Sequence, residues 1–113
     1  MNLDTLASQL HNTSTDKGFW EPLSRMENQD TFIFYAKQIA MIQSEATEVL
    51  EALRKSHGPD KVVEELADII IRTLDLWKGL TIYDSEEYPS LEEMVMSKSI
   101  TNQSRPKLHG VKG

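Results

Sequence analysis

Residues 60–78 carry a helical pattern in which the charged side chains, and not the apolar ones, form the narrow stripe. On a helical wheel with about 100° per residue, an arc of only about 100° contains Lys61, Glu64, Glu65, Asp68, Arg72 and Asp75. Apolar side chains cover most of the remaining circumference. A surface helix shows the reverse proportion. We therefore expect this helix to be surrounded by protein, with its charged stripe facing something other than bulk solvent.

The rest of the chain is also predicted to be helical. Apolar spacing predicts helices over 2–13, about 30–56 and about 60–78, with Asp30 as an N-cap and an end near Gly79. The capping-box residues Ser90-Leu91-Glu92-Glu93 open a last helix that runs to about residue 103. Gly58-Pro59 interrupts the helical pattern between the two long helices, and Gly58 is expected to end the first of them. The prediction is an all-α antiparallel bundle of four to five helices in a single domain, 1–113.

Length and charge narrow the class of protein further. A chain of 113 residues buries only about 60–70% of its unfolded surface, so association of subunits would extend its core. The net charge of −6 argues against non-specific nucleic-acid binding. No apolar run approaches the roughly 20 residues of a membrane span, and no signal peptide is evident at the start. We expect a cytoplasmic protein without a membrane or nucleic-acid partner.

Two pairs of carboxylates are the candidate functional residues. Glu45 and Glu48 lie one helical turn apart, with Glu45 inside an otherwise apolar seam, and Glu65 and Asp68 repeat the spacing on the next helix. The short break between the helices favours antiparallel packing, which would bring the pairs face to face. Buried carboxylates must be paired, protonated or bound to metal. An internal ion-pair network is the alternative, but within the charged stripe of residues 60–78 the two cations Lys61 and Arg72 leave negative charge on its four acids uncompensated.

All-oxygen ligands select hard cations, Mg²⁺ or Mn²⁺ before Zn²⁺. Magnesium usually binds through few carboxylates together with substrate phosphates. Metal-assisted hydrolysis of a phosphoanhydride is the chemistry that this ligand set suggests.

The two motifs together resemble a known family. Ser44-Glu45-Ala46-Thr47-Glu48, followed by Glu65-Leu66-Ala67-Asp68, is similar to the ExxE…ExxD signature of the MazG-like nucleotide pyrophosphohydrolases, which are all-α enzymes. The ending, with Lys98, Asn102, Arg105-Pro106 and His109-Gly110, resembles the family's K…N..RP..HG pattern. Many relatives have a further glutamate where this chain has Ser44. The resemblance covers roughly residues 18–113, and the text ELADIIIRTLDL is typical of small, phage-encoded members.

The resemblance implies a function and a set of roles. The enzyme would hydrolyse a (deoxy)nucleoside triphosphate to the monophosphate, releasing pyrophosphate or two phosphates. Two or more Mg²⁺ ions (Mn²⁺ in their place) would be held by Glu45, Glu48, Glu65 and Asp68. Glu45 or Glu48 would act as the catalytic residue that orients or deprotonates water. Within the basic segment 98–113, Lys98, Asn102 and Arg105 would bind the triphosphate. Subunits would form a homodimer or a homotetramer, in a prokaryotic cell or a phage-infected host.

The remaining candidates have simpler alternatives. Trp20 could stack on a nucleobase or pack in the core. Gln38 could hydrogen-bond to a base edge. Arg72 and Asp75 are interpreted as an ion pair behind the site, and His11 as a surface or capping residue. A non-catalytic nucleotide-binding or helical interaction module on the same scaffold is the alternative function.

Overall fold

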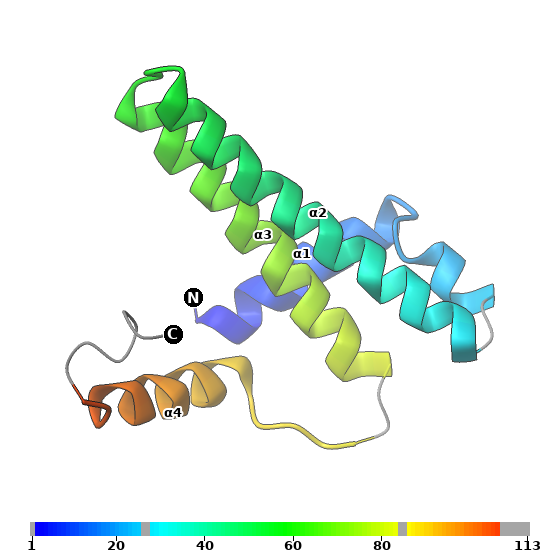
Figure 1. Ribbon diagram of the computed structural model, residues 1–113. Helices are drawn as coiled ribbons and strands as arrows, with labels where there is room; N and C mark the ends of the chain where they lie inside the picture. The colour runs from blue at the N-terminus through cyan, green and yellow to red at the C-terminus, as the bar shows by residue number, and fades with distance from the viewer. Residues whose placement is uncertain (1, 26–27, 84–85, 107–113) are drawn as a thin grey trace.

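The structure, a computed structural model, describes residues 2–25, 28–83 and 86–106. This part of the chain is all-helical and contains no strand, which confirms the prediction of an all-α fold. Its elements are α1 (Leu3–Asp16), the 3-10 helix η1 (Glu21–Arg25), α2 (Asn28–Arg54), α3 (Pro59–Tyr83) and α4 (Leu91–Gln103) (Figure 1). None of the described helices is both long and apolar enough to cross a bilayer.

The two long helices, α2 and α3, form an antiparallel hairpin, and α1 packs across α3 (Figure 1). The hairpin turn reverses the chain between Arg54 and Pro59. Ser56 has φ of 57° there and is the residue in the left-handed conformation, so the expectation that Gly58 ends the helix is wrong. Capping bonds such as His57 N to Ala52 O at 2.9 Å close the end of α2. At its other end α2 begins at Asn28, so Asp30 is not its N-cap.

Helix α3 does not end near Gly79, as the sequence suggests, but continues to Tyr83. Gly79 is buried, and a Cβ built on it would overlap the indole ring of Trp20. The missing side chain therefore makes room for a close approach between α3 and the loop after α1. Packing, and not helix termination, explains this glycine.

The buried side chains gather around the C-terminal half of α3 in two clusters. One cluster consists of Trp20, Leu23, Phe34 and Leu76, and the other of Ala7, Leu74 and Leu91. Partly buried Leu3, Leu6, Leu10 and Trp77 extend the second cluster. The core thus joins α1, η1, the first half of α2 and the start of α4 to one end of the hairpin.

The other end of the hairpin lacks such a cover within one chain. Leu50 and Leu53 on α2 are 54% and 60% exposed, and Val63 and Leu66 on α3 are 64% and 45% exposed. The radius of gyration of the Cα atoms is 16.4 Å, whereas a compact chain of this length has about 13 Å. The apolar excess expected for this helix therefore remains at the surface of the single chain.

Helix α4 is fastened at its first turn. The Ser90 side chain accepts a hydrogen bond from Glu93 N at 3.1 Å, as the capping box predicts. Asp4 of α1 accepts from Leu91 N at 2.7 Å and from Glu92 N at 3.1 Å. A carboxylate at a helix N-terminus satisfies free N–H groups and complements the helix dipole. These bonds tie the last helix to the first.

Candidate metal centre and adjoining cleft

The hairpin brings the two predicted carboxylate pairs together. One carboxylate oxygen from each of Glu45, Glu65 and Asp68 lies within 4.8 Å of the others. Oxygens on opposite sides of a single Mg²⁺ ion lie about 4 Å apart. Small rotations of these side chains would therefore let three ligands from two helices meet one cation.

Glu48 belongs to the same cluster. The pKa of Glu48 is raised above its ordinary value because its carboxyl lies within hydrogen-bonding reach of two other carboxylates. Glu65 has the larger effect and Glu45 the second. The negative charges of these two neighbours raise the pKa further, since like charges favour the protonated form. All four predicted acids thus converge, and their mutual repulsion makes the cluster a place where a cation would be stabilised.

Glu65 shows the clearest sign of an unmet partner. The residue is 7% exposed, and Lys61 Nζ lies 3.0 Å from its Oε1. This contact lowers the pKa of Glu65 against the opposing effect of burial, and the neighbouring Glu48 carboxyl lowers it further. Its other oxygen, Oε2, is buried and accepts no hydrogen bond from any described residue. A buried, ionised oxygen without a partner is costly, and a hard cation is a partner that its chemistry fits.

Arg72 lies beside the cluster and pairs with a ligand candidate. Its Nε donates to Glu45 Oε1 at 2.8 Å, and its Nη1 lies 3.9 Å from Met41 Sδ. The expected ion pair between Arg72 and Asp75 is therefore replaced by one with Glu45. The Arg72 side chain remains 37% exposed. The positive charge of Arg72 partly neutralises the carboxylate cluster, and its side chain is accessible to an anionic ligand.

A cleft of about 410 Å³ opens on this side of α3; we call it the acidic cleft. Its walls include Glu45, Asp68, Arg72 and Asp75 on the hairpin, and Ser14, Lys17 and Phe19 from α1 and the following loop. Lys17 is a cation that the sequence did not single out. Its position here depends on how α1 crosses α3, which no local pattern reveals.

A second cavity of about 470 Å³ adjoins the acidic cleft; we call it the apolar pocket. Ser14, Phe19, Arg72 and Asp75 line both cavities. The other walls of the apolar pocket are Pro22, Ile33, Phe34, Lys37, Gln38 and Met41. The structure thus places the candidate Gln38 in a pocket that adjoins the acidic cleft and has Phe19 and Phe34 in its walls.

Trp20 is not available for base stacking. Its side chain is only 3% exposed. Tyr83 stacks on it at 5.8 Å between ring centroids, and His11 meets it edge-on at 4.8 Å. The core interpretation is therefore the correct one for Trp20. Its neighbour Phe19 is 63% exposed and lines both cavities, so it is the aromatic side chain of this loop that faces the cleft.

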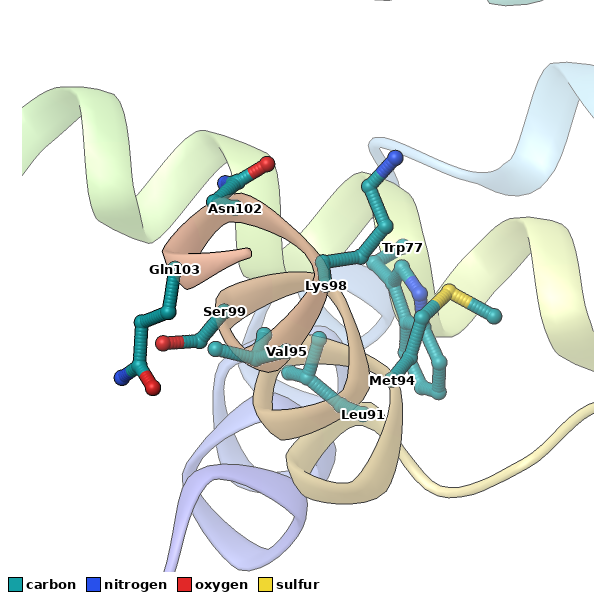
Figure 2. A pocket seen from close by; sticks show the side chains of 8 residues that line it. All are labelled: Trp77, Leu91, Met94, Val95, Lys98, Ser99, Asn102 and Gln103. Carbon is teal, nitrogen blue, oxygen red and sulfur yellow. The ribbon is translucent and has the colours of Figure 1, made fainter. Parts of the chain in front are cut away.

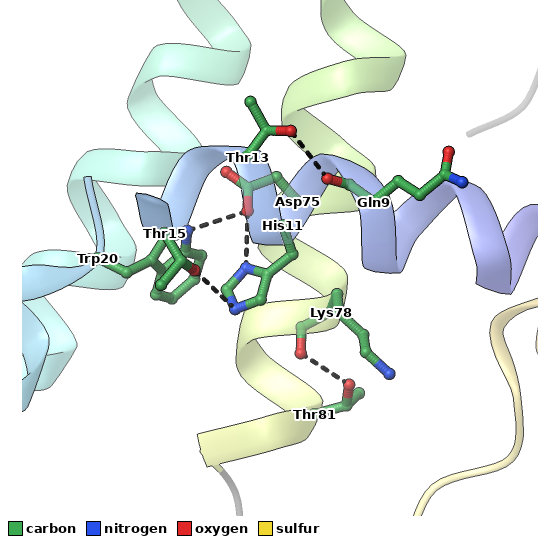
Figure 3. Close-up of polar contacts among 8 residues, drawn as sticks. All are labelled: Gln9, His11, Thr13, Thr15, Trp20, Asp75, Lys78 and Thr81. Atoms are coloured by element: carbon green, nitrogen blue, oxygen red, sulfur yellow. Dashed lines mark hydrogen bonds and ion pairs between the residues drawn. The ribbon is translucent and has the colours of Figure 1, made fainter. Parts of the chain in front are cut away.

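The expectation that His11 is a surface or capping residue is also wrong. It is 5% exposed, and its Nδ1 lies 2.8 Å from Asp75 Oδ1 (Figure 3). Trp20 Nε1 donates to the same oxygen at 2.9 Å. Asp75 lies 64 positions from His11 and 55 positions from Trp20, so only the charged stripe that contains Asp75 hinted at this contact.

The basic segment lies elsewhere in the single chain. Lys98 and Asn102 line a cavity of about 660 Å³ with Trp77, Leu91, Met94 and Val95 (Figure 2). Neither residue lines the acidic cleft, and α4 lies to one side of the hairpin (Figure 1). Arg105 follows α4 and is exposed. The remainder of the predicted motif, including His109 and Gly110, lies outside the described residues.

Comparison with protein families, curated proteins and solved structures gives no match to this chain. The resemblance to the MazG-like enzymes therefore stays a prediction.

Proposed function

We propose that this chain is a metal-dependent nucleoside triphosphate pyrophosphohydrolase. It would convert a (deoxy)nucleoside triphosphate to the monophosphate, with release of pyrophosphate or of two phosphates. The supporting observation is that carboxylate oxygens of Glu45, Glu65 and Asp68, from two helices, lie within 4.8 Å of one another, with Glu48 beside Glu65 and Glu45. The Oε2 atom of Glu65 is buried without a hydrogen-bond donor among the described residues. An ordinary solvated acidic surface has no reason to bury a carboxylate oxygen in this way.

The residues present fit a hard divalent cation. Glu45, Glu48, Glu65 and Asp68 would hold Mg²⁺, or Mn²⁺ in its place, as two or more ions. When bound, the metal would neutralise phosphate charge and lower the pKa of a water molecule. Without a cation, triphosphate and four carboxylates would repel each other, so the proposal requires metal for binding as well as for turnover.

The protein's own residues have separable roles in this proposal. Glu45 or Glu48 would orient the attacking water and accept its proton as the water oxygen bonds to phosphorus. The anhydride P–O bond then breaks, and its oxygen leaves with the departing phosphate group. Arg72 and Lys17, which line the acidic cleft, would approach the phosphates from the same chain. Arginine suits this task because its fork binds phosphate through two N–H groups.

The proposal includes a homodimer or homotetramer. A second copy would cover the exposed Leu50, Leu53, Val63 and Leu66. It is also the simplest source of the contacts from Lys98, Asn102 and Arg105, because in one chain Lys98 and Asn102 line a different cavity. These three substrate contacts therefore remain predictions that depend on assembly.

Asp68→Asn tests the metal assignment most directly. We expect it to abolish Mg²⁺-dependent release of monophosphate across a panel of the common (d)NTPs, while the helical circular dichroism signal is retained. Glu64→Gln is the control, because Glu64 lies on the same helix but its side chain is 68% exposed. Lys61 Nζ lies 3.9 Å from Glu64 Oε1. Wild-type turnover by Asp68→Asn would show that the acids are not metal ligands.

Calorimetry separates catalysis from the alternative function. Mg²⁺ and a non-hydrolysable triphosphate should bind to the wild-type protein together. Binding without turnover of any natural nucleotide would favour a non-catalytic nucleotide-binding module on this scaffold.

A further inference from the structure

Asp75 is held in a fixed orientation at the edge of the cleft, as expected for a residue that recognises a ligand. The proposed metal chemistry does not use it. Its side chain is 18% exposed. Both ring N–H groups that contact it, His11 Nδ1 and Trp20 Nε1, converge on Oδ1 (Figure 3). Because an ionised carboxylate only accepts hydrogen bonds, His11 must carry its hydrogen on Nδ1. Two donors on one oxygen fix the orientation of the carboxylate.

The second oxygen of Asp75 is the one left for a ligand. No described residue donates a hydrogen bond to Oδ2, and Figure 3 shows it turned away from both rings. Asp75 lines the acidic cleft and the apolar pocket alike. It therefore stands at the boundary between the cavity lined by the ligand candidates Glu45 and Asp68 and the cavity with aromatic walls.

The order of groups along α3 matches the order of groups in a nucleotide. Asp68, Arg72 and Asp75 follow one another on a single face of the helix, and Asp75 lies about 10 Å beyond Asp68 along the axis. In a nucleotide the sugar lies between the phosphates and the base. With the phosphates at Asp68 and Arg72 and the base in the apolar pocket, the sugar falls at Asp75.

We propose that Asp75 Oδ2 accepts a hydrogen bond from a sugar hydroxyl of the bound nucleotide, and so determines sugar specificity. A phosphate at this position would be repelled by the carboxylate, whereas a hydroxyl can donate to it. His11 and Trp20 are positioning residues that hold Asp75 for this contact. The inference rests on the proposed function, because it takes the nucleotide as the ligand.

The test compares ribonucleotide, 2′-deoxynucleotide and 2′,3′-dideoxynucleotide triphosphates with the same base. For the wild-type protein, we expect removal of the recognised hydroxyl to lower kcat/KM on the order of 10- to 100-fold. Asp75→Ala should lose about the same factor on the hydroxyl-bearing nucleotide and show nearly equal kcat/KM across the series. The wild-type protein and Asp75→Ala should therefore have similar kcat/KM on the nucleotide without that hydroxyl.

Asp75→Asn is the control for the case that Asp75→Ala fails to fold. Its amide oxygen can still accept from His11 and Trp20, while its NH₂ group replaces the acceptor that faces the cleft. We expect a folded protein with intermediate sugar discrimination, because a neutral bond replaces a charge-assisted one. Dissociation constants for the matching α,β-methylene nucleotides with Mg²⁺, measured by calorimetry, should follow the same order.

The outcomes distinguish this inference from the proposed function. Equal losses on all three sugars in folded Asp75→Asn, or a wild-type protein indifferent to the sugar, would overturn the role of Asp75 while hydrolysis stands. A dependence on the base and not the sugar would do the same. If the wild-type protein neither hydrolyses nor binds any nucleotide, the proposed function fails, and this inference fails with it.

Discussion

Gly79 on α3 lies directly against the indole ring of Trp20, so closely that a Cβ at this position would overlap three ring atoms. Trp20 in turn donates to Asp75, one turn earlier on the same helix. The contact thus joins the core to the residue that faces the cleft. A change at Gly79 is therefore expected to affect both the stability of the fold and the cleft.

Gly79→Ala should destabilise the protein even though alanine is the better helix former. The gain in helix propensity is about 1 kcal/mol, whereas overpacking against a rigid ring should cost about 3 kcal/mol. The free energy of unfolding, measured with urea, should fall accordingly. Thr73→Ala, at an exposed position of α3, should change it by no more than about 0.5 kcal/mol. A higher urea midpoint for Gly79→Ala would contradict the described packing.

Without metal, Glu48 should make stability fall as the pH rises. Its folded-state pKa is raised above the ordinary 4.5. Between the unfolded-state pKa and the folded-state pKa, the folded protein therefore keeps a proton that the unfolded chain has released, and stability falls as the pH rises. The pKa of Glu65 is lowered on folding, so Glu65 has the opposite effect on the pH dependence of stability. Its contribution to the stability of the fold is lost as the pH falls. Urea unfolding in the presence of EDTA, from acid to neutral pH, should show the difference between the wild-type protein and Glu48→Gln.

Glu48→Gln should be the more stable protein at neutral pH without metal, because one repelling charge is removed. Added Mg²⁺ should reverse the order by stabilising the wild-type protein more. Glu51→Gln is the control, since Glu51 pairs with Arg54 at 2.9 Å outside the cluster. Identical pH profiles for all three proteins would mean that the four acids do not interact in solution.

The exposed end of the hairpin predicts self-association. Sedimentation velocity should find the wild-type chain as a dimer or tetramer, since large exposed apolar patches mark interaction surfaces. Leu53→Glu should shift it towards monomer without loss of helical signal. Ile100→Glu is a matched control because Ile100 on α4 is 61% exposed, against 60% for Leu53. A wild-type protein that remains monomeric at high concentration would refute the assembly.

Mixing two inactive variants would show whether Lys98 serves its own chain or a neighbour. If Lys98 acts across the interface, a mixed dimer of Asp68→Asn and Lys98→Ala has one site with both defects and one site with neither. Activity should then reappear after the two are unfolded together and refolded. If Lys98 acts within its own chain, each site keeps one defect, and the mixture should stay as inactive as its components.

Much of the fold was predictable because the helices carry strong periodic patterns. The carboxylate cluster was predictable for the same reason. Two acids one turn apart on each of two helices with a short connection can hardly avoid meeting once the helices pack antiparallel. Ser90 as an N-cap also follows from local sequence. Each of these features depends on spacing within a few residues.

Apart from the local errors at Asp30 and Gly58, the errors involve contacts between distant residues. Gly79 reads as a helix end unless the ring of Trp20 is known to lie on it. His11 reads as a surface residue unless Asp75, 64 positions away, is known to face it. Lys98 and Asn102 share a helical face, as expected, but the path of α4 relative to the hairpin depends on the long-range bonds from Asp4. Periodicity carries no information on such crossings.

The attachment of α4 through Asp4 has a further consequence. Within the described part of the chain, the hydrogen bonds of α4 to other elements and its buried side chain are all at its first turn, where Leu91 enters the core and Asp4 bonds the first N–H groups. Its later turns, with Ile100 and Asn102, are exposed. A small tilt at the supported end becomes a large displacement at the other end. Substitutions at Asp4 should therefore alter where Lys98 and Asn102 can reach, although Asp4 itself lies on another helix.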